Sequence, residues 1–289
     1  MTSALLTGFT TGLLYGLMGF GIVTLFKTTG VANFAAGSIA TLGATVALKV
    51  SEGSGVPVLV AAGIGVAATV GVGATAYWVV MRFRDDVDHL SLTVRTVGLF
   101  LLAQALLEKW LGPGQPFSFP RLLPDLSTSV AGVHISSGTV WFPLVSVVCL
   151  AGFVSFFAFT RAGLLMRGLA SDARTAALLG VNTRLLSCIA WAMTAGLAAV
   201  VGILAAPSRL VSSEMMNSWL LYVFAGVVIG GLTSLGGAIV GGVTVGVVQG
   251  AAYQLASDEV ALLAVFALFL VTLQLRPQGL FGQPLIERL

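Results

Sequence analysis

Charged side chains are scarce in this sequence. Only 9% of its 289 residues are Asp, Glu, Lys or Arg, whereas 57% are apolar, and the mean hydropathy is +1.02. A soluble domain usually carries roughly 25% charged residues, so most of this surface cannot face water. The shortage of charge indicates an integral membrane protein.

Ionisable groups are missing from the centres of the apolar segments. His89 and His134 fall in expected loops, and Glu108 falls at the end of a span. A proton-coupled carrier usually needs such a group within the membrane, and a hydrolase needs a base that activates its nucleophile. No GxxxxGK[ST] phosphate loop occurs in the sequence. We therefore expect no enzyme, metal site or cofactor here, and any ATP to be bound by another subunit.

Cysteine and clustered basic residues are equally sparse. Cys149 and Cys188 lie far apart in apolar runs, which is too little for a disulfide framework or a metal site. The net charge is +3, but the basic residues are scattered, so no nucleic-acid partner is expected. The first basic residue, Lys27, follows the first apolar run, which favours a retained membrane helix over a cleaved signal peptide.

Long uncharged runs recur along the chain. A helix needs ~20 apolar residues to cross the bilayer, and this pattern predicts an all-α polytopic bundle that forms one domain over residues 1–289. Ser91–Leu107 carries one charge near its end, and Val260–Leu275 is short. The runs that qualify directly are Ala4–Phe26, Val58–Met81, Thr139–Thr160 and Leu185–Ser208.

Two further uncharged segments are unusual. Eleven of the eighteen residues of Val31–Leu48 are Ala, Gly, Ser or Thr, so this helix is expected inside the bundle, where backbones approach closely. Met215–Ser257 is uncharged for 43 residues and contains the glycine-rich Gly226–Gly242. We expect broken or re-entrant helices near 31–48 and 218–254, the second pair meeting near Thr233. Glycine spacing of this kind also serves close helix packing alone.

The basic residues predict the orientation. With Arg161–Arg184 and the C-terminus in the cytoplasm and the spans alternating, ten basic residues lie inside and four outside. The N-terminus then lies outside if Val31–Leu48 crosses fully, and inside if that segment is re-entrant.

The connector Arg161–Arg184 carries a helical pattern. Gly180 is expected to end its helix, and Asn182 or Thr183 to cap the next one. The connector is either an interfacial helix beneath the bilayer or a helix that docks into a cytoplasmic partner. Its apolar stripe is Leu165, Leu169, Ala173, Ala177 and Val181, and the charged residues off the stripe are Arg167, Asp172 and Arg174.

Four segments, in order, resemble the membrane subunits of branched-chain amino-acid ABC importers, a family that includes urea-type permeases. They are Leu13–Ala44, Arg167–Asn182, Phe224–Gly242 and the LRPQGLFG of Leu275–Gly282. One departure is Ala36, where many members have a polar residue, often His. This departure bears on the solute, because the position is expected to face the pathway.

The resemblance implies about eight or nine spans in the plasma or inner membrane, with a cytoplasmic C-terminus. It implies ATP-driven import of branched-chain amino acids or similar small solutes by alternating access. The implied partners are a second permease subunit, homologous or identical, two cytoplasmic ATPase subunits and an extracytoplasmic solute-binding protein. The alternative is a stand-alone channel or facilitator for a small neutral solute such as urea, which a charge-free path with broken helices would also suit.

Candidate functional residues follow from these two interpretations. Asn33, Phe34, Gly37, Ser38 and Thr41 are expected to line the solute pathway from one side. Gly230, Gly231, Thr233 and Ser234 are expected to line it from the other. The residues expected to couple the connector to the ATPase are Arg167, Asp172, Arg174, Ala177, Gly180 and Asn182.

Overall fold

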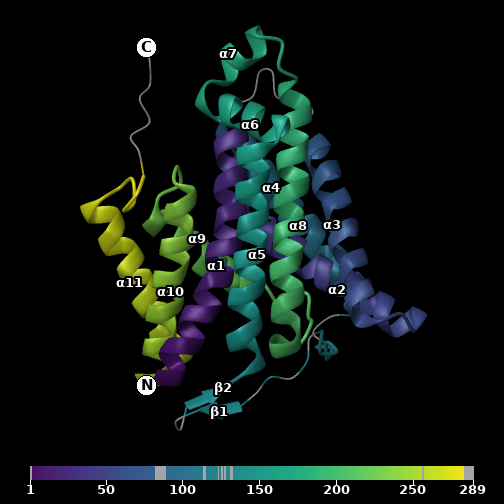
Figure 1. Cartoon of the computed structure of the whole chain (residues 1–289), viewed down its shortest axis with the longest axis vertical. Coiled ribbons are helices and arrows are strands. Elements are labelled where there is room, and N and C mark those ends of the chain that lie inside the picture. The colour runs from purple at the N-terminus through teal and green to yellow at the C-terminus, as the bar shows by residue number, and fades with distance from the viewer. Residues whose placement is uncertain are drawn as a thin grey trace. The chain divides into compact units, whose positions relative to one another are not determined.

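Helices make up most of the described residues in the computed structural model (Figure 1). The structure describes residues 2–81, 89–112, 115–122, 124, 126, 128–130, 133–255 and 257–282. The helices are α1 (Thr2–Thr29), α2 (Ala36–Ser54), α3 (Val58–Met81), α4 (His89–Leu111), α5 (Ser137–Phe159), α6 (Arg161–Ser171), α7 (Ala173–Leu178), α8 (Thr183–Arg209), α9 (Asn217–Gly230), α10 (Leu235–Leu255) and α11 (Asp258–Leu275). A short antiparallel hairpin, β1 (Thr128–Val130) with β2 (Val133–Ile135), precedes α5. The predicted all-α polytopic fold is confirmed.

Six of the described helices are long and apolar enough to cross a membrane, judged by length and composition: α1, α3, α4, α5, α8 and α10. Two shorter apolar helices are α9 and α11. The four runs that qualified directly lie within or largely within α1, α3, α5 and α8. Val31–Leu48 falls mainly in α2, which is not among these eight helices, and Met215–Ser257 contains both α9 and α10.

The chain folds as two compact units, each built from separate stretches of sequence. Unit 1 comprises Met1–Val23, Leu123–Val148 and Leu221–Leu289, and unit 2 comprises Thr24–Leu122 and Cys149–Leu220. Three of the four boundaries between these stretches fall within helices, in α1, α5 and α9. Whether residues 1–289 act as one domain stays a prediction.

Small residues bring α2, α3 and α8 together in unit 2. A Cβ added at Gly65 would lie 2.6 Å from the Gly43 carbonyl oxygen, and one added at Gly73 would lie 2.6 Å from that of Trp191. Backbones this close leave no room for larger side chains. Eleven residues of α2 are buried, and α2 packs against α3, α4 and α8. The predicted interior position of the small-residue helix is confirmed.

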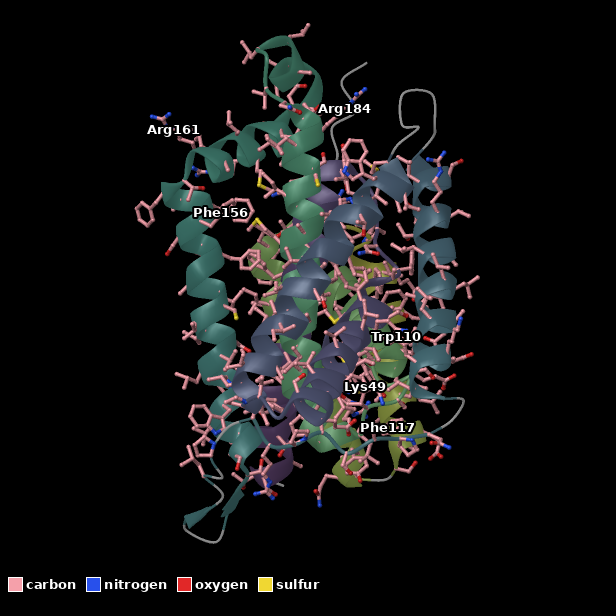
Figure 2. The ribbon with its side chains drawn as sticks, turned by 90° about the vertical axis from the view of Figure 1, so that its right-hand side faces the viewer. Lys49, Trp110, Phe117, Phe156, Arg161 and Arg184 are labelled. Atoms are coloured by element: carbon pink, nitrogen blue, oxygen red, sulfur yellow. The ribbon has the colours of Figure 1, made fainter. Side chains whose placement is uncertain are left out.

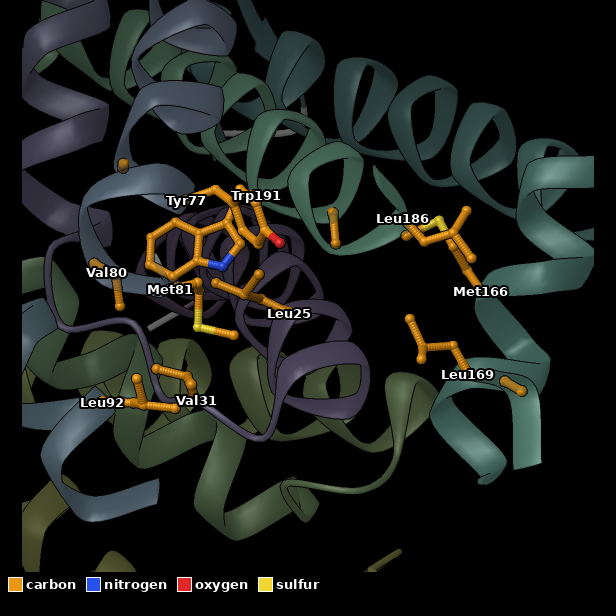
Figure 3. Packing of buried hydrophobic residues seen from close by; sticks show 13 residues of the cluster. Leu25, Val31, Tyr77, Val80, Met81, Leu92, Met166, Leu169, Leu186 and Trp191 are labelled. Carbon is orange, nitrogen blue, oxygen red and sulfur yellow. The ribbon is translucent and has the colours of Figure 1, made fainter. Parts of the chain in front are cut away.

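A cluster of larger apolar side chains fills one end of unit 2 (Figure 3). Tyr77 and Met81 of α3 lie beside Leu25 and Trp191, the last of which is 1% exposed. Met166 and Leu169 of α6 belong to the same cluster. The cluster therefore anchors the start of the connector to α3 and α8.

A glycine face joins α1 and α10 in unit 1. A Cβ at Gly8 would lie 2.5 Å from the Gly246 carbonyl oxygen, and one at Gly12 would lie 2.8 Å from the Val243 Cα. The Tyr15 hydroxyl donates a 2.8 Å hydrogen bond to Gln249 Oε1. These contacts join residues more than 200 positions apart.

The two expected helix interruptions occur at definite places. The first covers residues 30–35, between α1 and α2, so it lies at the start of the 31–48 segment and α2 itself is continuous. The second covers residues 231–234, between α9 and α10, and so includes Thr233, near which the two helices were expected to meet. Gly231 there has φ of +106°, which glycine adopts without the strain that a Cβ would add.

Candidate functional site: two helix interruptions and a capped connector

The first interruption is held by side-chain hydrogen bonds to its backbone. Asn33 Oδ1 accepts from the Ala35 N–H at 3.0 Å. Thr96 Oγ1, on α4, accepts from the Phe34 N–H at 3.2 Å and lies 3.0 Å from the Ala32 carbonyl oxygen, to which it can donate. Sequence analysis missed Thr96, because a single threonine in an apolar span gives no local sign of a partner 62 residues away.

The residues predicted to line the pathway from this side lie together at the start of α2. Asn33 is 5% exposed and Ser38 is fully buried, whereas Phe34 is 38% exposed. Ser38 Oγ has no hydrogen-bond partner, while Thr41 Oγ1 donates to the Gly37 carbonyl oxygen at 3.2 Å. A polar, largely buried group of residues therefore surrounds this helix start.

The second interruption owes its shape to capping and close packing. Ser234 Oγ accepts from the Gly237 N–H at 3.0 Å and so caps α10. Gly230 packs so closely on Gly237 that a Cβ at either would overlap the other's carbonyl group. Thr233 is partly buried. Packing accounts for these glycines, and their predicted role in lining a pathway stays a prediction.

The C-terminal LRPQGLFG segment completes the end of α9. The Leu280 N–H donates to the Ile229 carbonyl oxygen at 2.8 Å, and the Phe281 N–H donates to that of Gly230 at 3.0 Å. The last four carbonyl groups of a helix lack hydrogen-bond partners within the helix. The loop therefore supplies donors for two of these carbonyl groups at the end of α9. Gly279, with φ of +79°, lets the loop turn against the α9 backbone. Sequence analysis noted the motif but missed this contact.

The two predicted pathway sets belong to different units. Asn33, Phe34, Gly37, Ser38 and Thr41 lie in unit 2, and residues 230–234 lie in unit 1. Each set is brought together within its own unit.

The connector consists of two capped helices. Thr160 Oγ1 accepts from the Gly163 N–H at 2.9 Å and caps α6. Asp172 caps α7, because its carboxylate accepts from the Thr175 N–H at 3.0 Å and from the Thr175 hydroxyl at 2.6 Å.

The far end of the connector matches its prediction. Gly180, with φ of +79°, follows α7 and ends it. The Val181 N–H donates a hydrogen bond to the Ala176 carbonyl oxygen at 3.1 Å. Asn182 Oδ1 accepts from the Leu185 N–H at 3.0 Å and caps α8. The predicted stop and cap are therefore confirmed.

The predicted apolar stripe of the connector is partly wrong. Leu169 is buried as expected, and Val181 is partly buried and packs against the same cluster. Leu165, Ala173 and Ala177 are exposed, whereas Met166 and Ala176, which were not predicted, are buried. The extended backbone at Asp172 breaks the helical register between α6 and α7, which accounts for Ala173 and Ala177. Leu165 lies within α6, whose buried residues are Gly163, Met166 and Leu169.

Two of the charged residues predicted to couple the connector to the ATPase, Arg167 and Asp172, are exposed. Arg174 lies within α7, and its side chain is outside the described residues. Their predicted coupling roles stay predictions.

Two basic regions lie at opposite ends of unit 2 (Figure 2). Arg161 and Arg184 flank the connector at one end, and Lys49 lies at the other end, where its Nζ is 4.7 Å from the centroid of the Phe117 ring. This arrangement agrees with the predicted placement of the connector and Lys49 on opposite sides of a membrane.

Large apolar side chains are exposed at the tip of the connector. Leu178 and Leu179, at the end of α7, are 83% and 79% exposed. Neither contributes to the core, so both are available to a partner.

Comparisons with known proteins agree with one another. BraD, the high-affinity branched-chain amino acid transport system permease protein of Pseudomonas aeruginosa, is 25% identical over 299 residues, which cover 98% of this chain and 96% of that protein. LivH, the corresponding permease protein of Salmonella typhimurium, is 26% identical and covers 97% and 95%. LivH of Escherichia coli K12 is 25% identical with the same coverage.

A solved structure shares the fold. PsaBC from Streptococcus pneumoniae in complex with Fab superposes with a TM-score of 0.51 at 16% identity, over 96% of this chain and 92% of that one. The family model for the branched-chain amino acid transport system permease component matches residues 4–273. The chain therefore belongs to the family of permease components of branched-chain amino acid transport systems.

Proposed function

We propose that this chain is the membrane-spanning permease subunit of an ATP-driven importer and moves branched-chain amino acids or similar small solutes by alternating access. Family membership over nearly the whole chain supports the permease role. The printed names of BraD and LivH support the solute class.

The observation that carries the proposal is the connector of α6 and α7. It joins two helices that can span the membrane, α5 and α8, and is flanked by Arg161 and Arg184. We therefore place it outside the hydrocarbon core, where it exposes Leu178 and Leu179. An exposed apolar pair on a capped helix suits insertion into a groove of another protein.

The partner proposed for this surface is a cytoplasmic ATPase subunit. When two such subunits close on ATP, they displace α7, and the buried Met166 and Leu169 of α6 pass the displacement to α3 and α8. Because packed helices move as rigid bodies rather than deform, a shift at the connector changes the position of whole spans. The cavity between the two permease subunits then opens outward.

The proposed assembly contains a second permease subunit, homologous or identical, two ATPase subunits and an extracytoplasmic solute-binding protein, in the inner membrane. The C-terminus lies on the cytoplasmic side. ATP is bound and hydrolysed by the ATPase subunits. Affinity resides in the binding protein, so a path without ionisable groups favours release of the solute.

Replacement of Asp172 tests the coupling role. Asp172→Ala removes both hydrogen bonds to Thr175 and should destabilise the six-residue α7 by roughly 0.5–2 kcal/mol. Solute-stimulated ATP hydrolysis by the complete transporter in proteoliposomes should fall. Asp172→Asn keeps a capping oxygen and is the matched control, which should retain most activity.

Two results would contradict the proposal. Unchanged coupled ATP hydrolysis in both Asp172→Ala and the charge-reversed Asp172→Arg variant would exclude this helix from coupling. Solute uptake at the full rate by the permease without ATPase subunits would instead indicate a stand-alone facilitator.

A further inference from the structure

Two helices of unit 2 begin beside each other. A Cβ added at Gly37, in the first turn of α2, would lie 3.2 Å from the Met216 carbonyl oxygen and 3.3 Å from the Leu220 Cβ. Met216 immediately precedes α9 and Leu220 lies in its first turn, where the Leu220 N–H donates to the Met216 carbonyl oxygen at 2.9 Å. A residue larger than glycine at position 37 would push these two helix starts apart.

Neighbouring contacts place this junction within the length of the spans. Thr96, which holds the backbone just before α2, is seven residues from the start of α4, or about 10 Å along that helix. Ala40, one turn into α2, packs on Gly202, which is seven residues before the end of α8 and so also about 10 Å from it. The start of α2 is therefore away from both ends of the spans that surround it.

Helix starts placed this deep attract negative charge. The N-terminus of a helix carries roughly half a positive charge and several free N–H groups. Neither α2 nor α9 has an acidic residue in its first turn, and Ala35, at the N-cap of α2, provides no side-chain cap. The partial positive charge of both helix starts is thus not neutralised by their own residues.

Unpartnered polar atoms accompany the junction. Ser38 is fully buried and its Oγ has no hydrogen-bond partner. Its side chain leans toward the start of α2, because Cα–Cβ bonds tilt toward the helix N-terminus. The buried Asn217 Oδ1, in the first turn of α9, also lacks a partner. A buried polar group without a partner is costly, so both atoms point to a polar group that binds here.

We propose that the starts of α2 and α9 form a subsite for the carboxylate of an α-amino acid. The carboxylate lies at the first turn of α2, where Ser38 Oγ donates to it, with the start of α9 beside it. The inference rests on the proposed transport function and narrows its solute class to molecules that carry a carboxylate, which excludes urea and short amides at this subsite.

Charge-selective thiol labelling tests the subsite. Ser38→Cys and Asn217→Cys are made separately in a Cys149→Ala, Cys188→Ala background and assembled into the complete transporter in proteoliposomes. Ser187→Cys is the matched control, because Ser187 is also fully buried with an unpartnered hydroxyl, but lies on α8. The probes are anionic sulfonatoethyl and cationic trimethylammonioethyl methanethiosulfonate, each normalised to its rate with a free thiol.

The expected result has two parts. The anionic reagent modifies the Ser38→Cys thiol roughly 3- to 30-fold faster than the cationic one, as expected for a unit charge at a helix N-terminus. Leucine slows that labelling, whereas leucinamide, which lacks the carboxylate, does not. The Ser187→Cys thiol shows neither charge preference nor protection, and the Asn217→Cys thiol is also protected by leucine alone.

Several results would overturn the subsite. The subsite is refuted if the two reagents label at equal rates, or if leucine and leucinamide protect equally. It is also refuted if neither junction thiol is labelled, even during ATP hydrolysis. ATP-dependent leucine uptake by the unmodified transporter is measured in the same vesicles. Uptake without protection refutes the subsite alone, whereas absence of uptake refutes the proposed function.

Discussion

The C-terminal loop packs against the end of α9 at Gly231. One methyl group added at position 231 is therefore expected to detach the loop from α9. This residue has φ of +106°, and a Cβ there would lie 2.5 Å from the Gly282 backbone nitrogen. That distance is about 0.9 Å short of the 3.4 Å at which ordinary contacts begin. In Gly231→Ala the backbone strain costs about 1–3 kcal/mol, and the loop has to move away.

The loop has little with which to resist this displacement. Two hydrogen bonds, from the Leu280 and Phe281 N–H groups, hold it to α9, and each contributes roughly 0.5–1.5 kcal/mol net. The strain is therefore as large as the interaction that holds the loop, and the loop should detach. A loss of about 2 kcal/mol corresponds to roughly 30-fold faster exchange of both amides.

Hydrogen–deuterium exchange of the peptide that contains residues 276–282 measures this effect in the purified transporter. Gly236→Ala is the matched control, because Gly236 lies in the same glycine-rich segment and has nothing within 4 Å of its added Cβ. Equal exchange of the Leu280 and Phe281 amides in Gly231→Ala and Gly236→Ala would refute the capping role of the loop.

Two further substitutions test the packing of each unit. Gly12→Ala should lower the free energy of unfolding in mixed detergent by about 1–3 kcal/mol, because its Cβ would overlap the α10 backbone. Gly71→Ala, with open space around it, should be neutral or slightly stabilising, and equal stability of the two variants would contradict the glycine contact. Thr96→Val should cost about 0.5–1.5 kcal/mol in the same titration, because it removes the acceptor of the partly buried Phe34 N–H at the first interruption. The exposed Thr75→Val is its control, and a Thr96→Val loss no larger than this control's would show that the hydroxyl is dispensable.

Features set by neighbouring residues could be predicted from the sequence. Gly180 and Asn182 end and begin helices through backbone geometry within a few positions, and the interior location of α2 follows from its small residues alone. Asp172 was harder to interpret, because an aspartate can lie on a helix surface or cap a new helix. Only the structure shows that the Asp172 carboxylate accepts hydrogen bonds from Thr175 and caps α7, so that the connector forms two helices.

Features set by distant residues could not be predicted. The hydroxyl of Thr96 meets Phe34 across 62 residues, and the C-terminal loop meets α9 across about 50. No local pattern encodes such pairs, since either member would be unremarkable alone. For the same reason, the contact between Gly37 and Met216, on which the proposed amino-acid subsite depends, is visible only after folding.

The glycine face of α1 also constrains how the protein is synthesised. Tyr15 and Gln249, which join α1 to α10, are 234 residues apart, so the first helix enters the membrane long before its partner leaves the ribosome. At about 5–20 residues per second, this delay is roughly 10–50 s. During that time the narrow, glycine-lined surface of α1 has only lipid or the insertion machinery to cover it. Chains that stall before residue 235 would expose that surface permanently and become substrates for membrane quality control.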